Sequence, residues 1–347
     1  MSRVLVSLCH SEGAVFHSFL KIYPEWFIQC RYENFLCPFI LLHVVQDLPM
    51  RIVTRPDFDG IVCAVLLREA LHIDTDIYWV EPNAVQKKKA DIKAGDILAN
   101  LPHDPRCSLW FDHHVSNTPD QVFEGAHEIV PSAAGVVHKY YKASGHLDHR
   151  FDDLVLHTDI IDSASLTRDQ VLHPEDYPHI LLSMTIKNRD NTDTAYWNHL
   201  VEMLRTRDID AVMADSTVQA RCETVVQENT VYAGYLKEHT RIQGQISITD
   251  FRGLDPVPSG NRFLTYCLFP DTVASVKLRY TEPEKTHVLV SIGHSIFNRN
   301  CRVNVGHLLA RYGGGGHAGA GGCTLEAADA RQKIDEMIKI LETNAPV

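Results

Sequence analysis

Asp112, His113 and His114 form the strongest chemical signal in the sequence, because three metal-capable side chains follow directly after the apolar run 108–111. A buried strand that ends in such residues presents them at the carboxyl edge of a sheet, where open α/β folds place their ligand sites. Carboxylate and imidazole groups together suit Mn²⁺, Fe²⁺ or Zn²⁺ better than Ca²⁺. A pair of histidines satisfied within a turn is the alternative, and a second acidic pair at an equivalent strand end counts against it.

That second pair is Asp57 and Asp59, which follow the apolar run 51–54. Pro56 keeps the preceding residue extended and prevents the next helix from starting early. Two carboxylates at this spacing can point toward one cation from a loop, and hard divalent ions prefer oxygen ligands. Acidic residues also favour the N-terminus of any helix, so the pair alone does not choose between a metal site and a helix cap.

A further acidic pair, Asp159 and Asp162, lies at the end of the predicted helix 154–161. The three-residue spacing puts both side chains on one helical face. Either could complete a metal site, and either could equally cap the turn that leads into Ser163 and Ser165.

The segment 313–322 contains four successive glycines and then His317. Glycines allow positive φ and close backbone approach, and successive amides can form a nest for phosphate oxygens. The spacing matches neither the P-loop nor the dinucleotide-binding motif, since no Gly-Lys-Ser/Thr follows. His317 would add a donor to a bound anion, so we expect a phosphate site here, with a flexible hinge as the alternative.

Length, composition and charge fit a globular protein of two domains. The chain has 347 residues, 45% of them hydrophobic and 22% charged, and a formal net charge of −11, which argues against a protein that coats duplex nucleic acid. Residues 1–240 carry 21 basic and 34 acidic side chains, whereas residues 241–347 carry 12 and 10. An acidic half suited to divalent cations therefore precedes a mildly basic half suited to anions, although solvated surface charge would give the same asymmetry.

The nine cysteines show no CxxC pair, so we expect neither a zinc knuckle nor a disulfide scaffold, and a reducing cytoplasm is their natural setting. The aromatic-rich and cysteine-rich segment 1–49 is a poor signal peptide, and its apolar stretch 35–45 is too short to span a bilayer. We expect residues 1–49 to be a peripheral extension, with Met50 as an alternative start of the functional chain, rather than a structured cap. No membrane contact is expected.

From residue 51 onward, short apolar strands alternate with helices, which indicates parallel βαβ units covered on both faces. Strands are expected at 52–54, 76–80, 97–100 and 109–111, and helices at 60–71, 132–142 and 154–161. Residues 193–240 have helical spacing, and alternating strands are expected after them at 246–249, 262–269, 275–280 and 287–292, before helices at 305–312 and 326–342. The predicted fold is α/β, with a parallel-sheet metal domain (50–190), a helical connector (191–240) and a smaller C-terminal α/β phosphate-binding domain (241–347).

In these motifs the chain resembles the DHH family of phosphoesterases, which includes oligoribonuclease, bisphosphate phosphatase and exopolyphosphatase-like members. The family pairs an N-terminal domain bearing DxD and DHH motifs with a C-terminal domain ending in GGGH. The matching residues here are Asp57-Phe58-Asp59, Asp112-His113-His114 and Gly314-Gly315-Gly316-His317, and the resemblance covers roughly residues 50–347.

The resemblance implies two Mn²⁺ ions, with Mg²⁺ or Co²⁺ as substitutes, a bridging hydroxide as the nucleophile, and a substrate phosphate clamped between the domains. The implied metal ligands are Asp57, Asp59, His113 and Asp159, and the implied catalytic residues are Asp112, His113 and His114.

Two positions depart from the family pattern. Val53 stands where members usually carry a His, and Asn100 where they carry an Asp at the end of the strand before DHH. Asp96, at the start of that strand, is a displaced substitute for the missing carboxylate. These departures leave open whether the centre holds one metal ion or two.

The predicted activity is metal-dependent hydrolysis of phosphoester or phosphoanhydride bonds. Family substrates include short oligonucleotides, nucleoside bisphosphates, cyclic dinucleotides and polyphosphate, and the acidic net charge favours a small or single-stranded substrate over duplex nucleic acid. A homodimer is compatible with this function. The alternative is a non-catalytic nucleotide-binding regulatory protein with a degraded metal site.

Substrate capture is expected in the C-terminal domain. Arg279 ends the predicted strand 275–279, and Asn298 and Arg299 follow a predicted turn. A guanidinium offers phosphate a bidentate fork that backbone amides lack. Together with the glycine run these residues are expected to hold a terminal phosphate, although any single Arg is more often an ordinary surface charge.

Overall fold

A computed structural model describes residues 50–119, 121–187 and 192–346 of the chain. The expectation of a peripheral extension at residues 1–49 lies outside the described residues. Residues 49–347 form one compact unit, and the fold described below is the fold of that unit. Within the described residues, no helix combines the length and the apolar character needed to cross a bilayer.

The first sheet has five strands, all parallel, in the order β2-β1-β3-β4-β5. The strands are β1 (Arg51–Thr54), β2 (Tyr78–Trp79), β3 (Asp96–Ala99), β4 (Leu109–Asp112) and β5 (Gly125–His127). Because β1 and β4 run in the same direction on either side of β3, the residues after each strand meet at one edge of the sheet. The predicted α/β class with a parallel sheet is confirmed.

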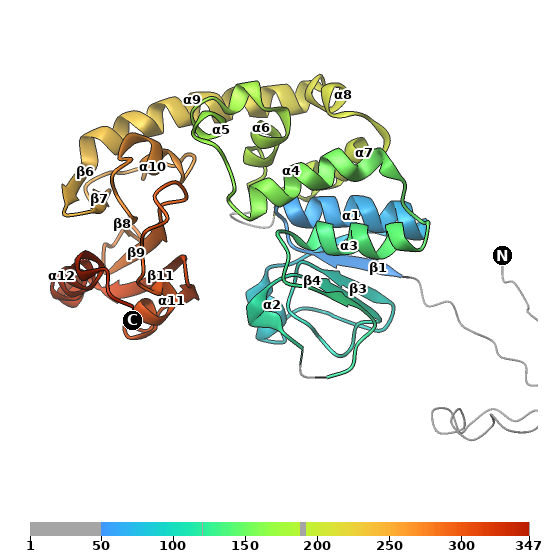
Figure 1. The fold of residues 1–347 in the computed structure, drawn as a ribbon, viewed down its shortest axis with the longest axis horizontal. Coiled ribbons are helices and arrows are strands. Elements are labelled where there is room, and N and C mark those ends of the chain that lie inside the picture. The colour runs from blue at the N-terminus through green and yellow to red at the C-terminus, as the bar shows by residue number, and fades with distance from the viewer. Residues whose placement is uncertain (1–49, 120, 188–191, 347) are drawn as a thin grey trace, which may run out of the picture. The chain divides into compact units, whose positions relative to one another are not determined.

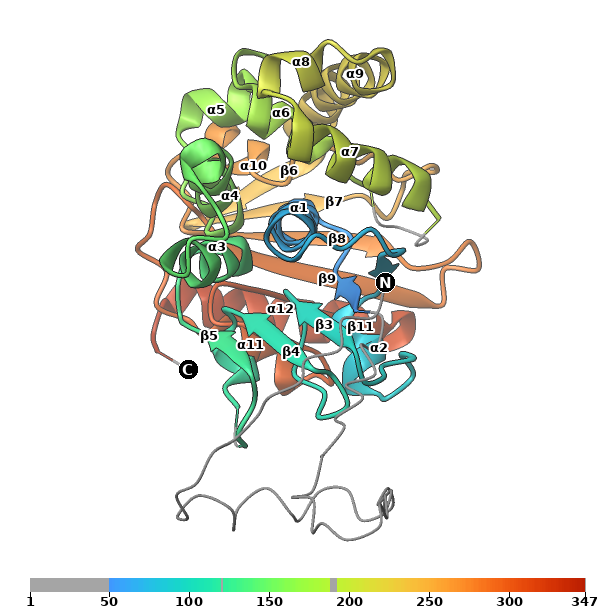
Figure 2. The same ribbon diagram turned by 90° about the vertical axis from the view of Figure 1, so that its right-hand side faces the viewer.

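Alternate strand residues supply two separate cores, as the two-residue side-chain period of a strand requires. Ile52 and Ile97 face a large core built with the helices α1 (Phe58–Leu71), α3 (Ala133–Ala143), α4 (Asp152–Asp162) and α7 (Thr194–Thr206). Val53 and Leu98 face the opposite side, where α2 (Pro82–Gln86) packs. Helices therefore cover both faces of the sheet (Figures 1 and 2).

Residues 193–240, expected as one helical connector, form three helices. These are α7, α8 (Ile209–Met213) and α9 (Ser216–His239). The breaks occur at Asp208 and Asp215, whose side chains accept hydrogen bonds from the first turns of α8 and α9 and so cap new helices. The helix α7 also packs in the large first core. The predicted domain boundaries at residues 190 and 240 stay predictions.

Shorter helical elements connect these parts. They are α5 (Arg168–Leu172), α6 (Pro178–Met184) and three 3₁₀ turns at Val115–Asn117, His149–Phe151 and Pro174–Asp176.

The second sheet is mixed and has six strands, in the order β10-β11-β9-β8-β7-β6. They are β6 (Thr240–Gln243), β7 (Ile246–Asp250), β8 (Ala274–Tyr280), β9 (His287–His294), β10 (Gly315–His317) and β11 (Ala320–Glu326). The helices α11 (Val305–Ala310) and α12 (Ala327–Thr343) pack with Val276, Leu278 and Val290 in a second core. The intervening residues of β8 and β9 therefore face the side that these two helices leave uncovered.

The strand expected at 262–269 is wrong, because this segment contains the helix α10 (Leu264–Leu268). Asn261 starts the turn: its side-chain oxygen accepts from the Phe263 amide at 3.0 Å and its carbonyl from the Leu264 amide at 3.1 Å. Leu264 and Tyr266 are then buried on the packed side. A short apolar run has no period that separates a buried helix from a strand, which is why the sequence misled here.

Candidate metal centre and substrate-binding residues

The turn between β1 and α1 holds the first acidic pair in two different environments. Asp57 caps α1, because its Oδ1 accepts from the Gly60 amide at 2.9 Å. Asp59 lies in the first turn of the helix and is 2% exposed. The helix-cap role that sequence alone could not separate from a metal role thus belongs to Asp57.

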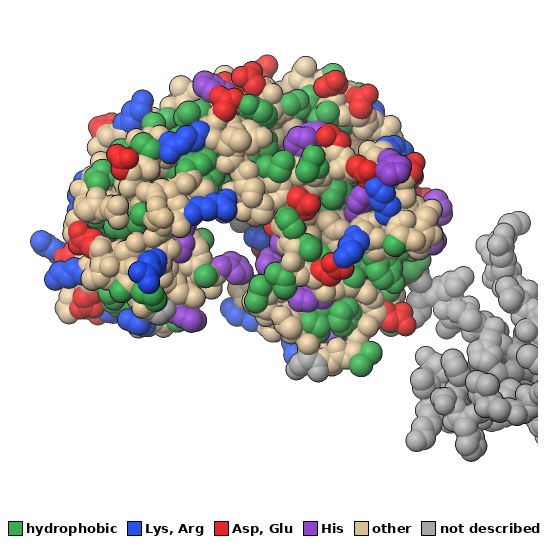
Figure 3. Space-filling model, in the orientation of Figure 1, with side chains coloured by type: hydrophobic (Ala, Val, Ile, Leu, Met, Phe, Trp, Pro, Cys, Tyr) green, Lys and Arg blue, Asp and Glu red, His purple; other side chains and the backbone are tan. Residues whose placement is uncertain are grey.

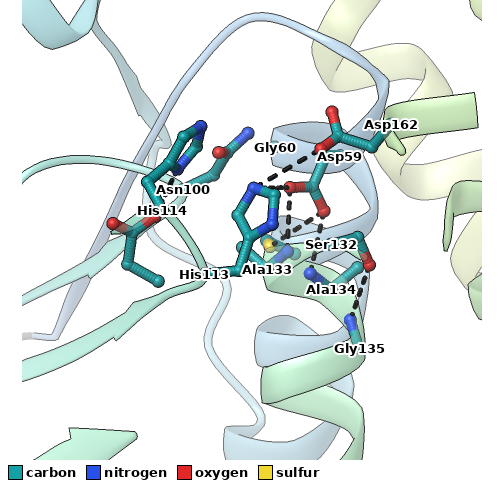
Figure 4. A network of polar contacts seen from close by, with 12 residues as sticks. Asp59, Gly60, Asn100, His113, His114, Ser132, Ala133, Ala134, Gly135 and Asp162 are labelled. Atoms are coloured by element: carbon teal, nitrogen blue, oxygen red, sulfur yellow. Dashed lines mark hydrogen bonds and ion pairs between the residues drawn. The ribbon is translucent and has the colours of Figure 1, made fainter. Parts of the chain in front are cut away.

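The carboxylate of Asp59 is bound by the N-terminus of α3. The Ala133 amide donates to Oδ2 at 3.0 Å and the Ala134 amide to Oδ1 at 2.8 Å (Figure 4). Ser132 caps the same helix through the Gly135 amide, at 2.9 Å. A carboxylate at a helix N-terminus is stabilised by the free amides and by the helix dipole, so α3 fixes the position of Asp59.

His113 follows β4 and points its ring toward Asp59 and Asp162 (Figure 4). Its Nδ1 lies 3.0 Å from the carbonyl oxygen of Val130 and donates to it, which leaves a lone pair on Nε2. That Nε2 is 3.8 Å from Asp59 Oδ2 and 3.4 Å from Asp162 Oδ2, and it is buried without a hydrogen-bond partner among the described residues. Metal-ligating histidines commonly donate their other nitrogen to a carbonyl in this way.

Asp59, His113 and Asp162 fit a metal ion. One ligand atom from each of the three lies within 4.8 Å of the others. Burial raises the pKa of Asp59 well above its ordinary value, and the charges of Asp162 and Asp57 raise it further. Burial, then the charge of Asp57, likewise raise the pKa of Asp162. A divalent cation would stabilise both carboxylates in their ionised forms.

The structure places Asp162, not Asp159, beside His113. The Oδ1 of Asp159 accepts a hydrogen bond from the Ser132 hydroxyl at 2.5 Å, so this carboxylate supports the cap of α3. Asp162 comes one helical turn later, where α4 ends. Of the two alternatives left open by the sequence, Asp162 is the residue that the fold brings to the candidate centre.

Asp96 is separated from the centre. It is the first residue of β3 and forms an ion pair with Arg51 at 2.8 Å, whereas Asn100 follows the last residue of the same strand. Four residues of a strand span about 13 Å, so Asp96 lies toward the opposite edge of the sheet. It does not substitute for a carboxylate at position 100.

Asp57 lies beside the centre, but its oxygens are already engaged. Asn100 donates from Nδ2 to Asp57 Oδ1 at 3.0 Å, and Arg55 Nη1 lies 3.1 Å from Asp57 Oδ2. The group of three ligand atoms found around His113 does not include Asp57.

Asp112 orients His114. Its two oxygens, fully buried, contact His114 Nδ1 at 2.9 Å and Asn117 Nδ2 at 2.7 Å. The hydrogen bond to this carboxylate raises the pKa of His114, against the opposing effect of burial. The ring of His317 lies 6.1 Å from that of His114, and Figure 3 shows histidines on both walls of a hollow between the two sheets.

The glycine run forms a tight hairpin between β10 and β11. A Cβ on Gly314 would lie 2.3 Å from Cys323 Cβ, and one on Gly316 would lie 2.3 Å from the Ala320 carbonyl oxygen. These glycines are thus required by close backbone approach, as the sequence suggested. Phosphate binding by Gly314, Gly315, Gly316 and His317 stays a prediction.

The remaining predicted substrate residues do not gather around His317. His317 pairs with Ala320 of β11, Ala320 with Gly293 of β9, and Gly293 with Ser275 of β8. Arg279 lies four residues further along β8, which corresponds to about 13 Å.

Asn298 and Arg299 bind their own loop. The side-chain amide of Asn298 donates to the Asp271 carbonyl at 3.2 Å, and Arg299 Nε donates to the Ile296 carbonyl at 3.0 Å.

Sequence reasoning missed Lys277, which lies on the uncovered face of β8. Burial lowers its pKa, and the charges of Arg279 and Arg262 lower it further. No carboxylate pairs with Lys277 among the described residues. An unpaired, partly buried ammonium group that also feels the charges of two guanidinium groups is a strong candidate for anion binding.

Two other features of the described residues do not form such a centre. Asp153, His157 and His179 also bring ligand atoms together, but the two rings stack at 4.2 Å with an interplanar angle of 9°, so their in-plane lone pairs cannot point at one ion. A surface hollow of about 930 Å³ lies along β6 to β8 and α12 and includes no residue of the candidate centre.

Comparisons with known proteins show which family the chain resembles. No protein-family model matches the sequence, and no curated protein matches it either. Among solved structures, PggH, a pGpG-specific phosphodiesterase from Vibrio cholerae, shares 30% identity over 85% of this chain and 100% of its own, with a TM-score of 0.73.

Two more distant structures share the fold. RecJ from Thermus thermophilus, in complex with Mn²⁺, is 13% identical over 84% of this chain and 52% of its own, with a TM-score of 0.53. The DHH domain of a member of a ribosomal protein family is 11% identical over 86% of this chain and 87% of its own, with a TM-score of 0.55. Because the chain is 30% identical to the Vibrio enzyme and covers all of it, the chain belongs to the DHH family of phosphoesterases and is a phosphoester hydrolase.

Proposed function

We propose that this enzyme cleaves the phosphodiester bond of short linear dinucleotides of the pGpG type, with Mn²⁺ as the preferred ion. The observation that carries the proposal is the convergence of Asp59, His113 and Asp162 around an orphaned imidazole nitrogen, on a chain 30% identical to a pGpG-specific phosphodiesterase. Mixed carboxylate and imidazole ligands suit Mn²⁺. The net charge of −11 also favours a short substrate with few phosphates.

When bound, the ion would polarise the phosphate and supply a nucleophilic water at neutral pH. The protein's own residues prepare the site for it. Two backbone amides hold Asp59, and the Val130 carbonyl fixes the ring of His113. Because Asp112 raises the pKa of His114, His114 is able to donate a proton from Nε2 to a phosphate oxygen.

We further propose that Lys277, Arg279 and Arg262 bind the terminal 5′-phosphate of the substrate. Burial, and then the charges of the two guanidinium groups, lower the pKa of Lys277, and a dianionic phosphate would relieve the repulsion among these three cations. His317, beside His114, would contact the phosphate being cleaved. A homodimer and a cytoplasmic location stay predictions.

The test is a substrate panel with pGpG, cyclic di-GMP, a linear pentanucleotide, a nucleoside bisphosphate and polyphosphate, each with Mn²⁺, Mg²⁺ and Co²⁺. We expect pGpG with Mn²⁺ to give the largest kcat/KM. Asp59→Asn and Asp162→Asn should lower kcat at least about 100-fold, since each removes a ligand. Asp153→Asn is the matched control, because this exposed carboxylate on the same helix contacts His157 and His179 instead.

Two outcomes would contradict the proposal. Full activity of Asp162→Asn would place the metal elsewhere. Tight binding of pGpG without turnover in any of the three metals would favour the regulatory alternative.

A further inference from the structure

The acidic residues around the candidate centre differ in whether their charge is already compensated. Asp112 is paired with His114 and Asn117, and Asp159 accepts from Ser132. The carboxylates of Asp59 and Asp162 face His113, and neither forms an ion pair with a Lys or Arg side chain among the described residues. Their charges are therefore left for a divalent ion at this site.

Asp57 is the decisive residue, because it is the remaining carboxylate beside this site. Its Oδ1 accepts from the Gly60 amide at 2.9 Å and from Asn100 Nδ2 at 3.0 Å. Its Oδ2 lies 3.1 Å from Arg55 Nη1. Both oxygens of Asp59 also accept hydrogen bonds, but from neutral backbone amides. Asp57 differs because one of its donors carries a permanent positive charge.

Asn100 strengthens this arrangement. It is 1% exposed, and its backbone adopts the left-handed conformation with φ of 56°, so its amide is held against Asp57. A carboxylate at this position would face Asp57 at about the same distance, and the two charges would repel unless one carboxylate took up a proton or a cation bound between them. The neutral amide of Asn100 adds no charge there, although its Oδ1 is buried without a hydrogen-bond partner among the described residues.

Val53, at the position where family members usually carry a His, supplies no metal ligand. Its side chain is fully buried with Leu98 and Trp110 in the core on the α2 face of the sheet. The charge of Arg55 also acts on the candidate centre, because it lowers the pKa of both Asp162 and His114.

We propose that Arg55 is the fixed second cation of this centre, and that the enzyme binds one catalytic divalent ion, at Asp59, His113 and Asp162. This inference rests on the metal site of the proposed function. The guanidinium group of Arg55, which lies between Asp57 and Glu81, compensates the charge of Asp57 in place of a second ion, and the Asn100 amide donates a hydrogen bond to the same carboxylate. Arg55 is thus a charge-compensating and positioning residue, and chelators cannot remove its charge.

The experiment counts bound Mn²⁺ by electron paramagnetic resonance and calorimetry, which need no turnover. The wild-type protein should bind one ion. The double variant Arg55→Met/Asn100→Asp should bind two, because it frees Asp57 Oδ2 and adds a carboxylate. Arg106→Met is the matched control and should still bind one, since Arg106 pairs in the same way with an Asp two residues away, at 2.7 Å, outside the centre.

Two ions of comparable affinity in the wild type would overturn the inference. So would a single ion in a double variant whose thermal unfolding shows that it is folded. If the double variant does not fold, the wild-type count still decides, and Arg55→Lys provides a second measurement, expected to keep one ion. A wild-type protein that binds one ion but cleaves no dinucleotide would refute the proposed substrate and leave this inference standing.

Discussion

The assignment of Asp162 to the metal centre makes opposite predictions for the protein with and without metal. Without metal, Asp59 and Asp162 face the same imidazole nitrogen and their ligand atoms lie within 4.8 Å of each other. Two full charges at that distance repel by about 3 kcal/mol at an effective dielectric constant of 20. The side chain of Asp162 is 32% exposed and its raised pKa relieves part of the repulsion, so we expect Asp162→Asn to stabilise the metal-free protein by about 1 kcal/mol.

With metal the order reverses. An ion at about 100 times its dissociation constant stabilises the wild-type fold by about 2.7 kcal/mol. For a protein of this size 1 kcal/mol corresponds to about 2 °C in Tm, so saturating Mn²⁺ should raise the wild-type Tm by about 5 °C. Asp162→Asn, which lacks a ligand, should melt about 2 °C above the wild type in chelator and below it in Mn²⁺.

The assay is thermal unfolding in chelator and across a Mn²⁺ titration. Asp159→Asn is the matched control on the same helix. It weakens the hydrogen bond with Ser132 and should melt lower in both conditions, while keeping the wild-type response to Mn²⁺. If Asp162→Asn responds to Mn²⁺ like the wild type and Asp159→Asn does not, the ligand assignment is wrong.

Three further results are expected. Lys277→Met should raise the free energy of unfolding by about 1 kcal/mol at pH 7, because it removes a partly buried, unpaired charge. It should also raise KM for pGpG at least about 10-fold if this charge binds the substrate as proposed. Burial lowers the pKa of Lys277 in the folded protein, so the stability of the wild type rises with pH up to the unfolded pKa of about 10.5. The stability advantage of Lys277→Met over the wild type should shrink over the same pH range. Equal stability of the two proteins at pH 7 would contradict this reasoning. Ser132→Ala should cost about 1 to 2 kcal/mol in chemical denaturation, because the cap of α3 is lost, and should leave the number of bound Mn²⁺ ions unchanged. Asp112→Asn should lower the pKa of His114, measured by NMR on the metal-free protein, since the hydrogen bond to this carboxylate is the main cause of the raised pKa.

The parallel sheet and its reactive edge could be predicted from the sequence because both depend on local patterns. Short apolar runs at 51–54 and 108–111 end in polar residues, and parallel strands bring their carboxyl ends to one edge. Asp57, Asp59 and His113 therefore had to lie near one another. This part of the prediction needed no knowledge of how the helices pack.

The choice between Asp159 and Asp162 could not be made in the same way. The two residues share one face of α4 but differ by about 4.5 Å along its axis. Which one reaches His113 depends on where α4 stops relative to the end of β4, and that is fixed by packing between distant segments. Asp96 was misplaced for a related reason: a carboxylate near a strand in sequence can lie at either edge, and its partner Arg51 is 45 positions away.

Lys277 shows the same limit in the second sheet, and it also indicates what that sheet is for. Alternation in β8 separates Val276 and Leu278 from Lys277 and Arg279, but alternation alone does not reveal which face α11 and α12 cover. Once they cover the apolar face, the opposite face is left with an ammonium group that burial and two guanidinium groups destabilise. Burying the Lys277 ammonium group without a carboxylate partner costs free energy, and a bound anion would offset that cost. Under this proposal the carboxyl edge of the first sheet would bind the metal ion, and the cationic face of the second sheet would bind the phosphate of the substrate.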